Sequence, residues 1–378
     1  MTDWHGNRAS ESYTYKRVAW SPGTAEHFQE FETYGNITSG SVELSAFTDL
    51  KASCQFEFEG GTPPDTTDLV RIYYSFVDDS GNEESVPLGT FFVNYGSVTY
   101  YRDGDTLIER GSVNGASTLS VLLDKKLGYP YTIAANTNCV TAADNLIKSL
   151  NLKTNNPTSN GTTTKSAHTF EPDDSYMTVV NWLLTTANFQ AAYPDPYGTV
   201  ILAQYVAPDS KPITATFADD SQSIMLPEVD MANDWYETPN VVRLCYQTDD
   251  ECLIAYASMD YGSSASLASR GQREVTLYES VDELDGANQT ARIANLKALA
   301  EQRLIDNASE IEKVQFTHAY IVMTPNDAIE IDYSGMVWKG NITDMTIDLQ
   351  PSTQCTTKLR RRIVPSTLII TTDGSAVW

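Results

Sequence analysis

The side chains best suited to acid–base or metal chemistry are few and dispersed in this chain. Its four histidines are His5, His27, His168 and His318, and none lies in an H-E-x-x-H pattern or near another histidine at metal-ligand spacing. The sequence has no G-x-S-x-G nucleophile elbow and no Gly-rich phosphate loop. Cys139 could meet His168 in space, but a buried thiol and a surface imidazole explain the two residues better. We therefore expect no enzyme activity, no catalytic or cofactor-binding residue, no cofactor and no metal site.

Acidic side chains are abundant, with 50 Asp and Glu against 25 Lys and Arg and a formal net charge of −25. Neighbouring pairs such as Asp173-Asp174 arise in so acidic a chain without any catalytic need, whereas a glycosidase needs two carboxylates about 5 to 10 Å apart across a cleft. Residues 78–84 lack the regular ligand spacing of a calcium loop and are expected to form a hairpin loop. The acidic balance also argues against sequence-specific nucleic-acid binding, which needs a basic surface, and against adhesion to anionic membranes.

Two groups of residues indicate a protein–protein surface. The chain has 21 tyrosines, and two tyrosine pairs are the first group, because tyrosine is enriched at interfaces, although strands also simply favour it. The second group is a basic run near the C-terminus, whose alternate residues share one face of a strand. That face could pair with the acidic surface of an identical neighbour, or it could be an edge strand that uses charge against aggregation. The candidate interface residues are Lys358, Arg360, Arg362, Tyr73, Tyr74, Tyr100 and Tyr101.

The elements that would position these residues are mostly strands. Period-two alternation and β-branched or aromatic runs predict five or more short strands within the first 110 or so residues, which suggests a small barrel or sandwich. After residue 117, leucines at helical spacing predict a helix over 119–127. A second helix is expected from Thr141, with Thr141 and Asp144 as a capping box, and a third over 176–188. Strands return after residue 208, interrupted by a long amphipathic helix at about 287–307. The tail, 369–378, has no strand partner visible in the sequence.

The length of 378 residues suggests two or three domains, and 41% hydrophobic with 20% charged residues indicates a globular chain. Five cysteines without a C-x-x-C pair indicate reduced thiols, and no run approaches a membrane span or a signal peptide, so we expect folding in a cytoplasm. The predicted fold class is α+β, predominantly β, with two tube-like β-barrel domains and α/β and helical insertions. The predicted divisions are an N-terminal barrel (1–116), an α/β segment (117–206), a second barrel region (207–365) with a helical insertion at about 285–308, and a tail (366–378).

The order of elements resembles a known family. Strands lead into RGSVNGASTLSVLLDKKL (110–127), then GYPYTIAANTNCVTAADNLIKSL (128–150), then TVVNWLLTTANFQAAYPDPYGTVIL (178–202). This succession, and the closing hairpins with an Arg-rich end in IEIDYSGMVWKGNITDMTIDLQPSTQCTTKLRRRI (329–363), are similar to the tail hub family of bacteriophages, which is related to the hub part of type VI secretion spikes. The similarity covers about residues 42–363 as a pattern, without invariant signature residues.

The resemblance implies a mechanical role. Hubs of this kind are homotrimers in which two tube-like barrels per chain imitate a sixfold ring. The tail tube or distal tail ring protein lies above them, and a spike, fibre or receptor-binding protein lies below. The implied location is the virion tail, assembled in the host cytoplasm, with the genome passing through a central channel. Acidic residues in the wall would keep DNA sliding. Many hubs continue into fibres or peptidase domains, whereas this sequence ends some fifteen residues after its last expected strand. We therefore expect any lytic or receptor-binding activity to belong to another protein.

Three other functions stay open from the sequence. A distal tail ring or other baseplate component would be β-rich but hexameric. A carbohydrate-binding adhesin module would carry an exposed aromatic platform. A glycosidase or peptidase would need an acid pair in a cleft.

Overall fold

The structure is a computed structural model. It describes residues 8–19, 29–60, 69–78, 80–206, 210–220, 223–233, 237–248, 251–281, 284, 286–307, 310–350, 352, 354–363 and 369–377. Strands make up 53% and helices 15%, so the predicted α+β, predominantly β class is confirmed. The chain divides into two compact units, one formed by Met1–Glu228 and Phe316–Lys358 and the other by Val229–Gln315 and Leu359–Trp378.

The first unit begins with a closed ring of antiparallel strands, in the order β1-β4-β5-β6-β3-β2 and back to β1. Because every strand has two neighbours, this is a barrel by its pairing, and its alternate side chains fill the interior. Tyr15, Phe56 and Phe58 are fully buried there, with the Tyr15 ring 5.4 Å from Phe56 and 5.9 Å from Phe58. The strands are β1 (Arg8–Ala19), β2 (Gln29–Ser45), β3 (Ala52–Glu59), β4 (Leu69–Asp78), β5 (Glu83–Asp103) and β6 (Thr106–Ser117).

A helical segment follows the barrel, built on one apolar core between its helices and short strand pairs. Its elements are α1 (Ser120–Asp124), β7 (Tyr131–Ile133), α2 (Cys139–Ser149), β8 (His168–Phe170), α3 (Tyr176–Thr186), β9 (Tyr193–Pro194) and β10 (Val200–Ile201).

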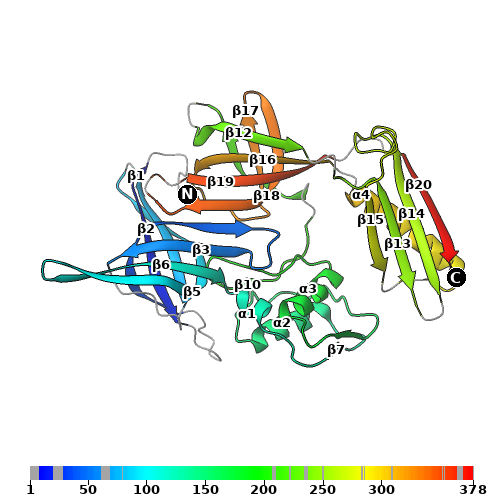
Figure 1. Ribbon diagram of the computed structural model, residues 1–378, viewed down its shortest axis with the longest axis horizontal. Coiled ribbons are helices and arrows are strands. Elements are labelled where there is room, and N and C mark those ends of the chain that lie inside the picture. Colours follow the sequence, from blue (N-terminus) through cyan, green and yellow to red (C-terminus); the bar gives the residue numbers. More distant parts are fainter. Residues whose placement is uncertain are drawn as a thin grey trace. The chain divides into compact units, whose positions relative to one another are not determined.

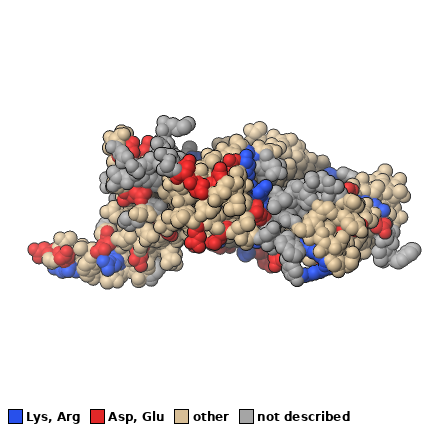
Figure 2. All heavy atoms as spheres, turned by 90° about the horizontal axis from the view of Figure 1, so that it is seen from above, with Lys and Arg blue, Asp and Glu red and all other residues tan. Residues whose placement is uncertain are grey.

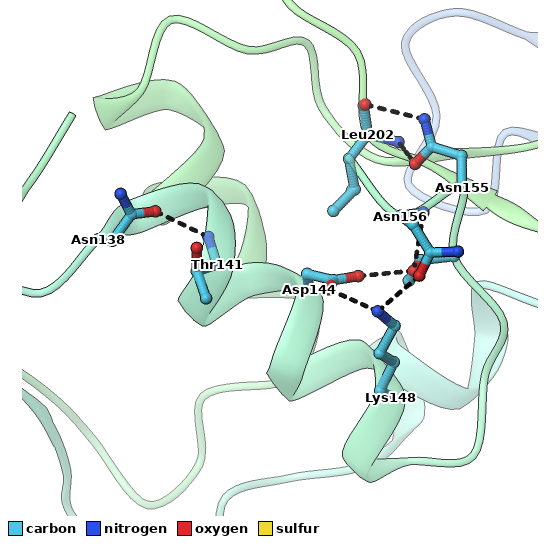
Figure 3. Close-up of polar contacts among 8 residues, drawn as sticks. Asn138, Thr141, Asp144, Lys148, Asn155, Asn156 and Leu202 are labelled. Carbon is cyan, nitrogen blue, oxygen red and sulfur yellow. Dashed lines mark hydrogen bonds and ion pairs between the residues drawn. The ribbon is translucent and has the colours of Figure 1, made fainter. Parts of the chain in front are cut away.

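Polar contacts tie α2 to the loop that follows it (Figure 3). Asp144 accepts from the Thr154 hydroxyl at 2.6 Å and pairs with Lys148 at 2.6 Å. The Asn155 side chain donates to and accepts from the backbone of Leu202. The predicted capping box at Thr141 and Asp144 is therefore wrong. The helix begins at Cys139, and Asn138 is its N-cap, accepting from the Thr141 N–H at 3.0 Å.

A second sheet joins the barrel directly, because β18 pairs with β17 through its first half and with β2 of the barrel through its second half. From β2 the order runs β2-β18-β19-β16-β12, and β17 carries β11 on its other side (Figure 1). In the part of the chain that the structure describes, β11 and β12 are free edges, so the second tube expected from the sequence stays a prediction. The strands are β11 (Ile213–Ala218), β12 (Met225–Asn233), β16 (Glu310–Ala319), β17 (Ala328–Tyr333), β18 (Met336–Asp348) and β19 (Gln354–Ile363).

The second unit has a four-stranded sheet in the order β15-β13-β14-β20, with one face covered by a long helix. The helix buries Leu296, Ala300 and Leu304, which confirms the amphipathic face expected from the sequence. The C-terminal tail forms β20 and pairs with β14, a partner that the sequence did not reveal. The elements are β13 (Val241–Gln247), β14 (Cys252–Tyr261), β15 (Thr276–Val281), α4 (Gln289–Asn307) and β20 (Ile369–Val377). The predicted domain boundaries stay predictions.

Candidate functional site: the polar face of the shared sheet

The feature that best suits a function is the outward face of the sheet where β3, β2 and β18 pair side by side. The register sets Ser45 opposite Asp344, Glu43 opposite Thr346, and Glu43 also opposite Ser53. Directly paired residues point to the same side of a sheet, and alternate residues along a strand stay on that side. We call this set of side chains the polar face; its members are Ser41, Glu43, Ser45, Ser53, Gln55, Glu57, Asp344, Thr346 and Asp348.

The opposite side of the same strands is apolar, which fixes the direction of the polar face. Val42, Phe56 and Ile347 are fully buried, whereas Glu43, Gln55 and Glu57 are exposed. A shift of one residue in any of these strands would exchange the two sets, so burial of the apolar set holds the polar face outward.

Charge on the polar face has a single sign. Its members include four carboxylates, at Glu43, Glu57, Asp344 and Asp348, and no Lys or Arg. The next strand of the sheet, β19, exposes Lys358 and Arg360, so cations border this acidic set. Asp344 and Asp348 lie about 13 Å apart along β18, but Glu43 lies on the diagonals to both, which by sheet geometry places it about 7 to 8 Å from each. That spacing is close to the Debye length of about 8 Å at physiological salt, so the carboxylates act together on an approaching charge.

Hydroxyl groups support two of these carboxylates. The Ser45 hydroxyl donates to Asp344 Oδ1 at 2.8 Å, and the Ser39 hydroxyl donates to Glu57 Oε2 at 3.1 Å. Desolvation by burial raises the pKa of Asp348 above its ordinary value. The surface is thus rich in hydroxyls and fixed negative charge. Such a surface repels a polyanion and offers it little to bind.

Acidic excess extends over other parts of the surface as well. Figure 2 shows more Asp and Glu than Lys and Arg among the described residues at the left and centre of the face in view.

At the end of β3, Glu59 pairs with Arg110 at 2.8 Å and also accepts a hydrogen bond from the Tyr101 hydroxyl. These contacts hold the pKa of Glu59 below its ordinary value.

The four predicted tyrosines lie in four different environments. Tyr74 is fully buried among rings of the barrel interior and donates to Glu11 at 2.7 Å. Tyr73 faces the other way beneath Lys16, whose ammonium lies 4.6 Å from the ring centroid, and burial raises the pKa of Tyr73 to about 12. Tyr101 is partly buried. Tyr100 is 57% exposed, so it alone offers most of its ring to another chain.

The predicted basic face lies on β19. Lys358 and Arg360 are exposed and Leu359 between them is buried, as the strand alternation predicts. Arg361 points to the other side and pairs with Glu312 at 3.5 Å. The Arg362 side chain lies outside the described residues. A role of these cations in an interface stays a prediction.

The residues considered for chemistry have structural surroundings. Cys139 is buried in the helical core, and the His168 ring stacks on Trp182 with centroids 4.6 Å apart. His318 is buried, and its ring forms hydrogen bonds of 2.8 Å with the Ala319 carbonyl, through Nδ1, and with the Thr357 hydroxyl, through Nε2. His5 and His27 lie outside the described residues. Among the residues that the structure describes, no group of three His, Cys, Asp or Glu could hold a metal ion. In the same residues, no helix combines the length and the hydropathy of a membrane span.

The loop after β4 is a turn stabilised by hydrogen bonds to the Asp78 carboxylate. Asp78 accepts from the backbone N–H groups of Ser80 and Asn82 and from the Asn82 side chain, at 2.8 to 3.0 Å. These bonds lower the pKa of Asp78, with the Asn82 side chain as the largest cause. The hairpin interpretation of this segment is confirmed by the pairing of β4 with β5.

The polar face was missed by the sequence analysis. Alternation around Glu43 and Glu57 indicated half-buried strands, but nothing in the sequence showed that a strand some 300 residues later would pair beside β2. The signal that was available is the matching alternation of Asp344, Thr346 and Asp348.

Comparisons with known proteins rest on structure alone, since no protein-family model and no curated protein matches the sequence. The tail protein from Neisseria meningitidis MC58 is similar with a TM-score of 0.59 and 14% identity, covering 93% of this chain and 97% of that one. The 43 kDa tail protein of prophage MuSo2 from Shewanella oneidensis has a TM-score of 0.60 and 12% identity, covering 92% and 98%.

A chain of the half-lidded PdpA-VgrG complex from Francisella has a TM-score of 0.55 and 9% identity; the match covers 96% of this chain and 60% of that one. At such identities these likenesses show the fold. The chain therefore has the fold of phage tail proteins, which is also found in a VgrG complex, and the resemblance seen in the sequence is confirmed at that level.

Proposed function

We propose that this chain is a structural protein of a bacteriophage tail, and that three copies form a hub between a hexameric tail tube and a threefold tail tip. In this proposal the polar face of each copy lines the channel for the genome. The tube or a distal tail ring lies above, and a spike, fibre or receptor-binding protein lies below. The chain has no enzymatic role.

The observation that carries the proposal is the junction of β2 with β18. It joins two sheets edge to edge, so one continuous layer of strands presents one polar, acidic face. A channel wall for DNA needs such a face, because Lys and Arg would bind phosphates and delay passage. The fold shared with two phage tail proteins supports the tail location, and its occurrence in a PdpA-VgrG complex supports assembly with a second protein.

The test is the number of copies. Native mass spectrometry of the full chain should give a species of three times the 41.7 kDa chain mass, and images of assembled tails should show threefold symmetry at this protein. A species of six copies would favour the distal tail ring instead. A single copy in solution and at the tail end would contradict the hub.

Carbohydrate binding is the second candidate, because His168 and Trp182 form a partly exposed aromatic stack beside the β7–β8 strand pair. Sugars bind to such rings through their apolar faces. A glycan array with the full chain tests this function, and a Trp182→Ala variant should lose any glycan signal if the stack is the binding site.

A further inference from the structure

The last strands of the barrel form an arm that extends past their neighbours. β3 ends opposite Arg110 of β6, and β4 ends its pairing with β5 at Phe92. Residues 100–109, which we call the arm, then have strand partners only in each other, from Tyr100 opposite Glu109 to Asp103 opposite Thr106. In Figure 1 this hairpin extends to the left of the other barrel strands.

One face of the arm is an uncovered continuation of the barrel interior. Val113 and Gly111 of β6 are buried inside the barrel, and two-residue steps along the strand carry the same side to Glu109 and Leu107. Leu107 is 56% exposed there and Tyr100, on the same face, is 57% exposed. A two-stranded hairpin alone is marginally stable in water, so a partner on this face or edge would stabilise it.

The arm also carries a cation on the uncovered face, diagonal to Glu109. Arg102 lies opposite Leu107, on the same side as Tyr100, and is exposed. Among the residues that the structure describes, no carboxylate pairs with Arg102. Among the residues that the structure describes, β5 has no strand partner on its other side after Phe92, so this edge is free along the arm.

The edge strand β12 of the same sheet offers a complementary edge. β12 is the last strand after β16, and its side chains are largely exposed on both faces. Leu226 is 43% exposed, and Glu228, two residues later on the same side, is exposed and without a cationic partner among the described residues. The arm has the same order of an apolar and then a charged residue, with the opposite sign, in Tyr100 and Arg102.

We propose that the arm of one copy docks along the free edge of β12 in a second copy. A parallel alignment sets Tyr100 against Leu226 and Arg102 against Glu228 on one side of the joined strands. Pro227 has no N–H, and its carbonyl already accepts from the Tyr333 hydroxyl at 2.8 Å. Side-chain pairs rather than a continuous backbone ladder therefore carry this contact. Because the two edges differ, the contact is head-to-tail and closes into a ring when the rotation allows it. The inference rests on the proposed hub and names its subunit contact.

The test is a charge swap in the full chain. Arg102→Glu and Glu228→Arg should each lower the association constant between copies about tenfold, because each places like charges together. The double variant should restore association, since the pair is rebuilt with reversed signs. Lys126→Glu is the matched control: it makes the same charge change on an exposed lysine of the helical segment and should leave association unchanged. Sedimentation equilibrium over a concentration series measures the constants, and circular dichroism shows that each variant is folded.

The outcomes separate the two proposals. Recovery in the double variant supports the arm contact. A trimer whose association is unchanged in both single variants, or a double variant no better than the weaker single one, overturns the arm contact and leaves the hub standing. A wild-type chain that does not self-associate overturns both.

Discussion

Asp348 is held on the polar face at a cost to the folded state. Its pKa is raised by desolvation, which means that the folded chain prefers the neutral acid more than the unfolded chain does. Glu43 lies diagonally across the strand pair and adds a like charge. Desolvation and the nearby Glu43 charge thus both disfavour the ionised form of Asp348 in the folded chain.

The stability effect of Asp348 should depend on pH with a definite sign. A carboxyl whose folded pKa is raised contributes most below its unfolded pKa, about 3.9 for Asp, and that contribution is lost as pH rises through the folded pKa. Asp348→Asn should therefore raise the free energy of unfolding at pH 7, by less than about 1 kcal/mol because the group is partly exposed. The gain should vanish near pH 3.

Asp344→Asn is the control for this effect. It removes a carboxylate from the same row, but the amide oxygen can still accept from Ser45. Urea unfolding of both variants at several pH values measures the difference. A gain that is equal in the two variants, or that persists at pH 3, would mean that burial of Asp348 is not its cause.

At the level of elements, the helical segment is fastened to the barrel by one turn. Arg71 of β4 donates to the Tyr197 carbonyl at 3.0 Å, and the Thr118 hydroxyl donates to the Gly198 carbonyl at 3.1 Å. Gly198 has φ +85°, and an added Cβ would lie 3.2 Å from Thr118 and 3.3 Å from Thr90. The turn thus needs both the left-handed backbone and the missing side chain of glycine.

Gly198→Ala should lower the free energy of unfolding by more than the backbone conformation alone explains. A left-handed alanine costs about 1 to 2 kcal/mol, and the close contacts should add about 1 kcal/mol or more. Gly128→Ala provides the comparison, because Gly128 has φ +77° with open space around its Cβ position. Urea unfolding of the two variants gives the difference in the free energy of unfolding. Equal losses would show that an added methyl group at residue 198 makes no costly contact with Thr118 or Thr90.

Strands were predictable where polar and apolar residues alternate, and less so where the chain is polar throughout. The strands around Val42, Phe56 and Val70 followed from local pattern, whereas β1 is a polar segment whose Tyr13 and Tyr15 become a buried row only within the barrel. The start of α2 was missed by two residues, because Asn138 caps the helix while Thr141 supplies only its N–H. The helix itself was predicted correctly, but the cap was assigned to the Thr141 side chain, whereas the amide oxygen of Asn138 supplies it.

The candidate site was less predictable than the fold for a physical reason. Tyrosine frequency does not distinguish a core residue such as Tyr74 from a surface residue such as Tyr100, because both suit a strand. The polar face depends on a pairing between residues 41–45 and 344–348. Such long-range pairing follows from the whole set of strands, and no local pattern specifies it.

On the scale of the whole molecule, a formal net charge of −25 acts strongly on an approaching charge only where several acidic side chains lie close together. The polar face arranges four of them on three adjacent strands, with no Lys or Arg among its own members. If three copies surround DNA with this face, reversing its charge should convert a repelling wall into a binding one. Reversing as many acids elsewhere should not.

The triple variant Glu43→Lys, Glu57→Lys and Asp348→Lys should bind double-stranded DNA about tenfold more tightly than a control with the same charge change. Asp124→Lys, Glu171→Lys and Asp173→Lys make that control, since all three acids are exposed on the helical segment. Fluorescence anisotropy of labelled DNA at several salt concentrations measures both affinity and its salt slope. Because each phosphate contact adds about 0.9 to that slope, the channel variant should show the steeper one. Equal affinities and slopes in the two variants would mean that DNA meets the whole acidic surface alike, and the polar face would lose its assignment as the channel wall.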